Sequence, residues 1–210
     1  MDHRAYPRGW RGSRHAWCGA GMRNAVPHRT IPGLMPRYVA FLRAINVGGH
    51  TVEMAKLKKL FEQLALAGVE TFIASGNVIF EAGNGSATAL EKRIGAHLEK
   101  SLGYEVATFL RTPAELAGVV AYRAFPKPAA GSTLYIGFQA AECSVAVRKQ
   151  VAAMSTDFDH LHVHGREIYW RIAGRFSDSK VTGAKVEKAL GQPTTIRKVT
   201  TVEKLAKKVG

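Results

Sequence analysis

Basic side chains stand where several predicted elements begin or end, an arrangement that could bind an anion. Arg43 follows the apolar run of residues 38–42, and Arg111 and Arg197 follow two further β-rich runs. Lys180 precedes a predicted helix. If strand ends from the two parts of the chain converge, these cations form one pocket that favours phosphate or carboxylate groups. Its neutral hydrogen-bonding groups would be those of Asn46, Ser75, Asn77 and Ser179. The competing interpretation is that these ends are scattered and solvated.

The loop Asn46-Val47-Gly48-Gly49 joins a predicted strand to a predicted helix. Backbone N–H groups and the helix dipole can hold an anion at such a place. We therefore add Gly48 and Gly49 to the candidate anion site. The loop matches neither GxGxxG nor the P-loop pattern, and a plain turn that needs flexible glycines also explains it.

Three histidines, His160, His162 and His164, alternate with Leu161 and Val163. A strand would place the imidazoles on one face, where two of them could share a zinc or copper ion. No further histidine or cysteine cluster completes such a site. We expect a solvated polar face and no bound metal.

Residues for covalent catalysis are sparse. Cys143 is predicted near the start of a helix, where the dipole could activate a thiol. No base is near it in the sequence, so a small residue packed in the core is the simpler interpretation. No G-x-S-x-G elbow and no recognisable pair of carboxylates occurs. The sequence names no catalytic residue and no cofactor, and whether the chain is an enzyme stays open.

Residues 35–125 are predicted to form a βαββαβ unit with a trailing helix. Strands are predicted at 37–43, 69–74, 78–81 and 105–111, and helices at 53–67, 88–102 and from Pro113 onward. The turn Ser75-Gly76-Asn77 is typical of a hairpin. Thr88 with Glu91, and Thr112 with Glu115, have the spacing of a capping box.

The same order of elements returns in residues 132–210, after a Pro/Gly-rich linker at 126–131. Strands are predicted at 134–138, 161–164, 167–171 and 194–197, and helices at 141–154, 182–190 and 200–209. Thr200 with Glu203 is predicted to form a further capping box. An offset of 88 residues pairs Thr112 and Glu115 with Thr200 and Glu203, which indicates an ancient duplication. Each half should form an antiparallel sheet with two helices on one face.

Composition indicates a folded, soluble protein. Hydrophobic residues make up 46% of the 210 residues and charged residues 22%, as in ordinary globular proteins. No segment approaches the roughly 20 apolar residues that cross a bilayer. The two cysteines form no metal or redox motif. We therefore expect a cytoplasmic protein without membrane partners, and its oligomeric state stays open.

The net charge is +14, of which +5 falls on residues 1–34. This arm has no helical or strand periodicity, so we expect it to be disordered. The abrupt change at Met35 favours natural translation starting there, and a basic nucleic-acid-binding tail is the alternative. The charge also suggests weak, sequence-independent nucleic-acid binding. A stacking surface for bases would need Phe80, Tyr169 or Trp170 on an open sheet face.

Several motifs in residues 35–210 together resemble domain-of-unknown-function family 1697, a bacterial family. They are Arg43-Ala44-Ile45-Asn46-Val47-Gly48-Gly49, Ser75-Gly76-Asn77-Val78-Ile79-Phe80, Arg111-Thr112, Gly165-Arg166-Glu167-Ile168-Tyr169 and Ser179-Lys180. The resemblance implies an α+β fold with two ferredoxin-like halves. It implies no reaction, cofactor or catalytic residue. After Arg197 the family commonly has asparagine and tryptophan, where this chain has Lys198 and Val199.

Function concentrates at loops and strand ends, where the motif residues lie. The leading hypothesis is therefore a cleft between the two halves that binds a small anionic or phosphate-bearing ligand. Weak nucleic-acid binding is the second hypothesis, and an enzyme of unknown class is the third.

Overall fold

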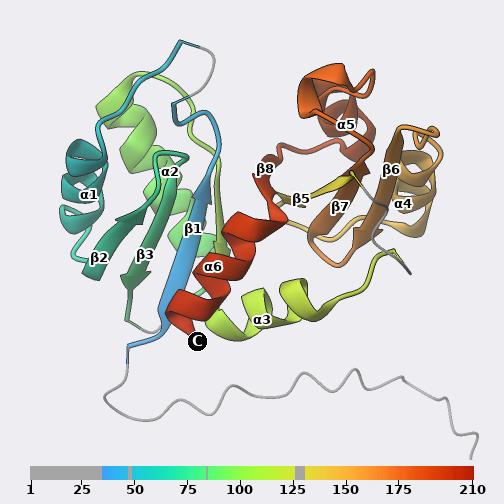
Figure 1. The fold of residues 1–210 in the computed structure, drawn as a ribbon. Coiled ribbons are helices and arrows are strands. Elements are labelled where there is room, and N and C mark those ends of the chain that lie inside the picture. The colour runs from blue at the N-terminus through green and yellow to red at the C-terminus, as the bar shows by residue number, and fades with distance from the viewer. Residues whose placement is uncertain (1–34, 47–48, 84, 126–130) are drawn as a thin grey trace, which may run out of the picture. The chain divides into compact units, whose positions relative to one another are not determined.

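The computed structural model describes residues 35–46, 49–83, 85–125 and 131–210 (Figure 1). Residues 35–210 form one compact unit. The predictions made for the arm 1–34, for the translation start, for Gly48 and for all of the linker but Gly131 fall outside the described residues. In the part of the chain that is described, no helix combines the length and the apolar character needed to cross a membrane.

The N-terminal sheet contains four strands in the order β2-β3-β1-β4, and every neighbouring pair is antiparallel. Its strands are β1 (Arg37–Leu42), β2 (Ala67–Phe72), β3 (Asn77–Glu81) and β4 (Thr108–Arg111). Its helices are α1 (Met54–Glu62), α2 (Ala87–Leu102) and the trailing α3 (Pro113–Ala121). Strand β1 pairs directly with β3, and Phe41 of β1 lies opposite Asn77 of β3.

The C-terminal sheet repeats this layout with the order β6-β7-β5-β8, again with antiparallel neighbours. Its strands are β5 (Thr133–Phe138), β6 (Asp159–His164), β7 (Glu167–Ile172) and β8 (Thr195–Lys198). The helices are α4 (Val145–Ala152), the short 3₁₀ helix η1 (Phe176–Asp178), α5 (Gly183–Leu190) and the trailing α6 (Val199–Val209). The predicted α+β class with two antiparallel sheets is confirmed.

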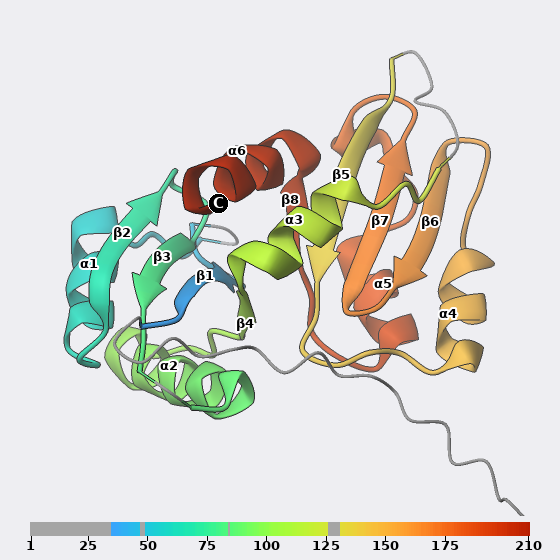
Figure 2. The same cartoon turned by 90° about the horizontal axis from the view of Figure 1, so that it is seen from below.

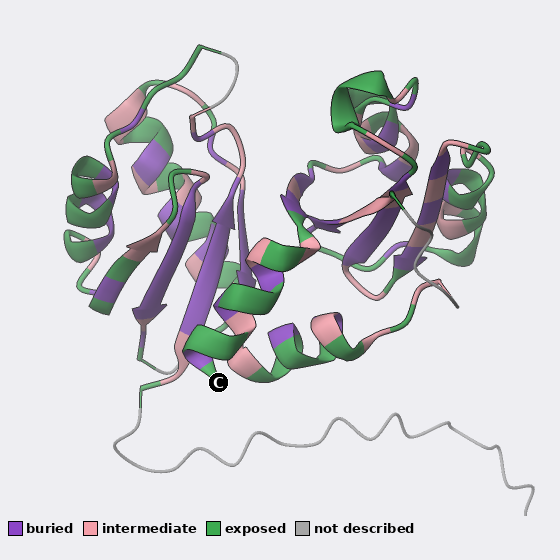
Figure 3. Cartoon of the chain, in the orientation of Figure 1, coloured by how far each residue is buried: buried purple, intermediate pink, exposed green. Residues whose placement is uncertain are grey.

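Helices cover the outer face of each sheet, and the trailing helices lie between the sheets (Figures 1 and 2). One outer core joins α1 and α2 to the N-terminal sheet, and another joins α4 and α5 to the C-terminal sheet. A central core joins α3, α6 and the inner faces of both sheets. At its centre the rings of Phe41 and Phe138 stack with centroids 3.8 Å apart. Figure 3 shows β1 and β3 of the N-terminal sheet as almost entirely buried.

The three aromatic residues considered for nucleobase stacking are part of these cores. Phe80 lies in the core under α1 and α2, Tyr169 lies in the central core, and Trp170 lies under α4 and α5. Each is at most 1% exposed. These rings therefore offer no surface on which a base could stack.

Two of the predicted capping boxes do not form, because their helices begin at other residues. Helix α2 begins after Ser86, whose hydroxyl accepts the N–H of Ala89. The prediction at Thr88 and Glu91 is wrong, because the buried Glu91 carboxylate instead accepts the N–H of Leu110 on the edge strand β4 at 2.7 Å.

The second wrong capping box is that of Thr200 and Glu203. Helix α6 starts at Val199 with Lys198 as its N-cap, and no side chain caps it. The start is set by tertiary structure, since Lys198 still pairs with Tyr135 in the β8–β5 ladder. By contrast, the box of Thr112 and Glu115 forms as predicted.

The shared central core predicts that both sheets unfold together. Phe41→Ala should lower the free energy of unfolding by about 3–5 kcal/mol, because it removes a fully buried ring and leaves a cavity. Urea denaturation followed by circular dichroism should still show one transition. Val145→Ala is the control, since Val145 is 58% exposed. Two separate transitions in the Phe41→Ala variant would contradict a single cooperative unit.

Candidate functional site

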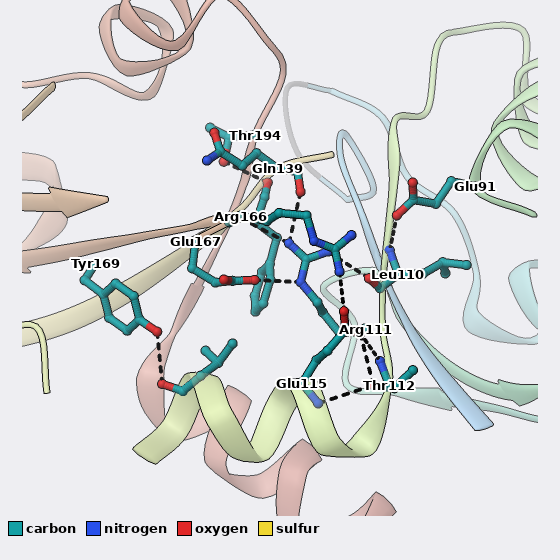
Figure 4. Close-up of polar contacts among 12 residues, drawn as sticks. Glu91, Leu110, Arg111, Thr112, Glu115, Gln139, Arg166, Glu167, Tyr169 and Thr194 are labelled. Carbon is teal, nitrogen blue, oxygen red and sulfur yellow. Dashed lines mark hydrogen bonds and ion pairs between the residues drawn. The ribbon is translucent and has the colours of Figure 1, made fainter. Parts of the chain in front are cut away.

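Arg111, the last residue of β4, is buried where the N-terminal sheet meets the β6–β7 hairpin (Figure 4). Its Nε donates to the Glu167 carboxylate at 2.6 Å. The Nη1 and Nη2 groups donate to the backbone oxygens of Leu110, Gln139 and Arg166. Burial lowers the pKa of Arg111, and the Glu167 charge opposes this shift. The guanidinium is thus a neutralised cross-link between the sheets.

Arg197 of β8 makes the reciprocal cross-link. Its Nε donates to Asn77 Oδ1 at 2.7 Å, and its Nη2 donates to the backbone oxygens of Leu42 and Gly76. The Nη1 group donates to the side chain of Thr195 and to the oxygen of Ile196. Each arginine therefore comes from the fourth strand of its own sheet. Each donates to the backbone oxygen of the residue before it in the chain. Each also contacts the other sheet at two places. One is the hairpin turn before that sheet's third strand, and the other is the end of its first strand.

The two cross-links differ in charge. Glu167 neutralises Arg111, whereas the partner of Arg197 is the neutral amide of Asn77. Within the described part of the chain, no carboxylate pairs with Arg197. Burial lowers the pKa of Arg197 to about 10, so the group stays charged at neutral pH. A positive charge is thus held in a low-dielectric place without a counter-charge, which is costly unless other groups compensate it.

A cavity of about 590 Å³ lies beside this charge. One wall comes from the residues after β1 and from the β2–β3 turn, and the other from η1, α5 and β8. The lining side chains with polar or aromatic groups include Arg43, Asn46, Ser75, Phe176, Glu187 and Arg197.

Arg43 crosses this cavity to Glu187 of α5. Its Nε and Nη2 donate to the two carboxylate oxygens at 2.8 and 3.0 Å. The hydrogen bond to Glu187 raises the pKa of Arg43. The side chain is 40% exposed, and its Nη1 has no partner among the described residues. Arg43 therefore retains donors for a ligand.

Residues with strained backbone occur in two loops at this cavity, the loop after β1 and the segment between β2 and β3, where Ile73 precedes the lining residue Ala74. Ala44, Asn46 and Ile73 have positive φ angles of 63°, 55° and 50°. These values are uncommon for residues other than glycine and are an outlier for β-branched Ile73. The Asn46 Oδ1 accepts the N–H of Val52 within the segment between β1 and α1. Its Nδ2 donates to the backbone oxygen of Ala74 and so joins this segment to the one between β2 and β3. Such strain is concentrated at functional sites in proteins.

The glycine in the β2–β3 turn is required by close packing. Gly76 has φ +72°, and a Cβ at this position would lie 2.8 Å from Cβ of Ile45. Its backbone oxygen also accepts the N–H of Leu42 at 2.9 Å. Gly76 therefore lets the turn lie against the loop that carries Arg43 and Asn46.

The structure brings together only part of the predicted pocket. Arg43, Asn46, Ser75 and Arg197 line the cavity, and the buried Asn77 contacts it through Arg197. The prediction of a single pocket that also holds Arg111 is wrong. Strands β1 and β4 are antiparallel, so their carboxyl ends lie at opposite ends of the sheet. Arg111 instead lines a separate cavity of about 290 Å³.

The remaining predicted residues lie outside the larger cavity. The Ser179 hydroxyl donates to Asp159 and accepts the N–H of Val181, so it shapes the segment before α5. Lys180 is exposed, and Gly49 is an exposed turn residue with φ +87°. None of the three is among the lining residues.

Sequence reasoning missed that Glu187, Phe176 and the first residues of the helix predicted at 182–190 line the cavity. Glu187 lies 144 residues from its partner Arg43, so no local pattern could reveal the pair. Phe176 belongs to a three-residue helix without periodicity. The signal for α5 was present, because Thr182 is its N-cap and Gly183 and Ala184 begin it, but nothing in the chain indicated which surface they face.

The predicted alternation of the three histidines is present on β6, with Leu161 and Val163 buried. No group of three or more potential metal ligands occurs among the described residues. His162 Nε2 instead forms a 2.8 Å hydrogen bond with Tyr122 OH, and the ring of His164 stacks on Tyr122 at 3.9 Å. Cys143 is buried against Gln139 and Gln192 just before α4. Both sets of residues serve packing.

The buried cross-link predicts a large stability difference between two neighbouring arginines. Arg111→Met should lower the free energy of unfolding by about 3–5 kcal/mol, because it leaves the Glu167 charge buried and unpaired. Arg166→Met removes a partly exposed pair with Glu115 and should cost less than about 1 kcal/mol. Urea denaturation measures both. Equal losses would show that the Arg111 pair is not an effective cross-link.

The contact between His162 and Tyr122 predicts a pH dependence. Burial and the nearby His164 lower the pKa of His162 below its usual 6.5. The unfolded chain therefore takes up this proton before the folded chain does, and stability falls as pH drops below about 6.5. His162→Gln does not titrate, so its melting temperature should fall less than that of the wild type between about pH 7 and about pH 5. Identical profiles would contradict this role.

Comparison with solved structures identifies a similar fold in a conserved bacterial protein from Streptococcus pneumoniae. The two share 24% sequence identity with a TM-score of 0.64, over 84% of this chain and 100% of that protein. A search of curated proteins gives no significant match.

The family model described as "Protein of unknown function (DUF1697)" matches residues 35–169. These residues include β1 to β4, β5, β6 and most of the buried arginine network. The match covers more than half of the 210 residues. The chain therefore belongs to the DUF1697 family of proteins of unknown function.

Proposed function

We propose that the cavity beside Arg43 and Arg197 binds a small anionic or phosphate-bearing ligand. The observation that carries the proposal is the buried Arg197 charge, which has no carboxylate partner in the described residues and lines the cavity of about 590 Å³. A ligand anion in this cavity would supply the missing counter-charge. Low surrounding dielectric makes that attraction stronger than it would be in water.

The two arginines would act differently on the ligand. The N–H groups of Arg197 are all used by protein oxygens, so this residue contributes positive potential and no direct hydrogen bond. Arg43 retains Nη1 for a direct charged hydrogen bond, which is a strong type of contact. Glu187 holds the Arg43 side chain in place through two hydrogen bonds.

Helix α5 supports the same ligand class. Gly183 and Ala184, its first two residues, line the cavity. The amino end of a helix carries a partial positive charge and favours anions. The first turn of α5 contains no acidic residue, so nothing in that turn offsets the attraction.

We also propose that residues 35–125 and 132–210 are ferredoxin-like halves that arose by duplication. The support is the shared strand order of the two sheets and the reciprocal contacts of Arg111 and Arg197. The cavity would then be a cleft between the two copies. In this view the copies diverged at the cross-links, where one kept a carboxylate partner and the other kept an amide.

The anion proposal predicts thermal stabilisation by inorganic phosphate and pyrophosphate. At constant ionic strength set with chloride, the wild-type melting temperature should rise with either anion, because binding to the folded state stabilises it. Ala184→Glu should abolish the rise, since a carboxylate in the cavity repels the anion. The new acidic group lies in the first turn of α5, where it favours the helix, so the variant should fold.

Ala184→Gln is the matched control, with nearly the same volume and no charge, and it should keep most of the rise. A second variant, Asn77→Asp, places a carboxylate beside Arg197 Nε and should also remove the rise. It loses the donation from Asn77 to Phe72, so a lower starting melting temperature is expected. No rise in the wild type, or an equal rise in Ala184→Glu, overturns the proposal.

A further inference from the structure

The cavity is lined by apolar residues as well as by cationic ones. Leu42, Ile45 and Ile196 line it together with Phe176. Its volume of about 590 Å³ falls in the range of about 300–1,000 Å³ that is typical of sites for small organic molecules. A bare phosphate ion would fill only a small part of this volume and would make no favourable contact with these apolar side chains.

Phe176 is exposed to an unusual degree for an aromatic residue. It is 38% exposed. Four large apolar side chains in the described ranges are exposed, and Phe176 is the only one of the four that lines the cavity. The others are Met35, Ile73 and Val145. Burying apolar surface on binding is favourable, so an exposed ring that lines a cavity is available for contact with an apolar part of a ligand.

The exposed ring is also held in position. Its centroid lies 4.9 Å from that of Tyr135, with 65° between the ring planes, and 5.2 Å from that of Trp170. Both supporting rings are buried. Contacts on one side fix the ring of Phe176 while the rest of its surface remains available. A ring fixed in this way loses little conformational freedom when a ligand stacks on it.

We infer that the ligand is a phosphate monoester that carries an aromatic or heteroaromatic ring, with its ring on Phe176 and its phosphate near Arg43. This inference rests on the proposed anion site. Phe176 and Arg43 line one cavity, so one molecule with both chemical features can contact both residues. Nucleoside monophosphates and simple aryl phosphates belong to this class.

The test is isothermal titration calorimetry of the full chain with three probes, inorganic phosphate, ribose 5-phosphate and phenyl phosphate. Phenyl phosphate should bind about tenfold or more tightly than ribose 5-phosphate, since stacking on an aromatic side chain provides that much preference. Phe176→Leu should reduce the affinity for phenyl phosphate to about that for ribose 5-phosphate. Phe176→Tyr keeps a ring and should retain the preference.

The outcomes separate the two proposals. If none of the probes binds the wild type, the anion site itself is absent. If inorganic phosphate binds but the two monoesters bind equally, the anion site stands and the aromatic ligand class is wrong. An undiminished preference in Phe176→Leu, with its fold confirmed by near-ultraviolet circular dichroism, also overturns the inference. Should that variant not fold, the wild-type comparison and Phe176→Tyr still decide the matter.

Discussion

Two buried guanidinium groups join the sheets of this protein, and the remaining architecture depends on them. Arg111 and Arg197 each donate to backbone oxygens of the opposite sheet as well as to one side chain. Only arginine presents five donors in a rigid, planar arrangement, which suits a place where carbonyl groups from several chain segments meet. Without these donors, buried oxygens such as those of Leu42 and Gln139 would lose hydrogen-bond partners, which is costly.

The central core makes these polar contacts effective. Phe41 and Phe138 stack between the sheets, and α3 and α6 exclude water around them. In this apolar surrounding a charge that lacks a counter-charge exerts a strong field. Glu167 cancels that field at Arg111, whereas Asn77 leaves it at Arg197. Under the proposed function, this difference between a carboxylate and an amide separates a structural cross-link at Arg111 from one at Arg197 that favours an anion in the adjoining cavity.

Much of the fold was accessible to sequence reasoning because its signals are local. The apolar stripe of α1, the proline and threonine at the start of α3 and the hairpin turn at Gly76 depend on neighbouring residues. The capping boxes at Glu91 and Thr200 failed for the opposite reason. Glu91 is used by a strand 19 residues away, and the start of α6 is determined by the ladder between β8 and β5.

By itself, the amino-acid sequence determined the order of helices and strands, because periodicity and turn chemistry act over a few residues. It also indicated that Arg43, Asn46, Ser75 and Arg197 belong to a polar region. Only the tertiary structure decided which charges meet. It paired Arg43 with Glu187, separated Arg111 from the cavity through antiparallel pairing, and placed the exposed ring of Phe176 in the same cavity as Arg43 and Arg197. Charge pairing depends on long-range chain crossings, which no local pattern encodes.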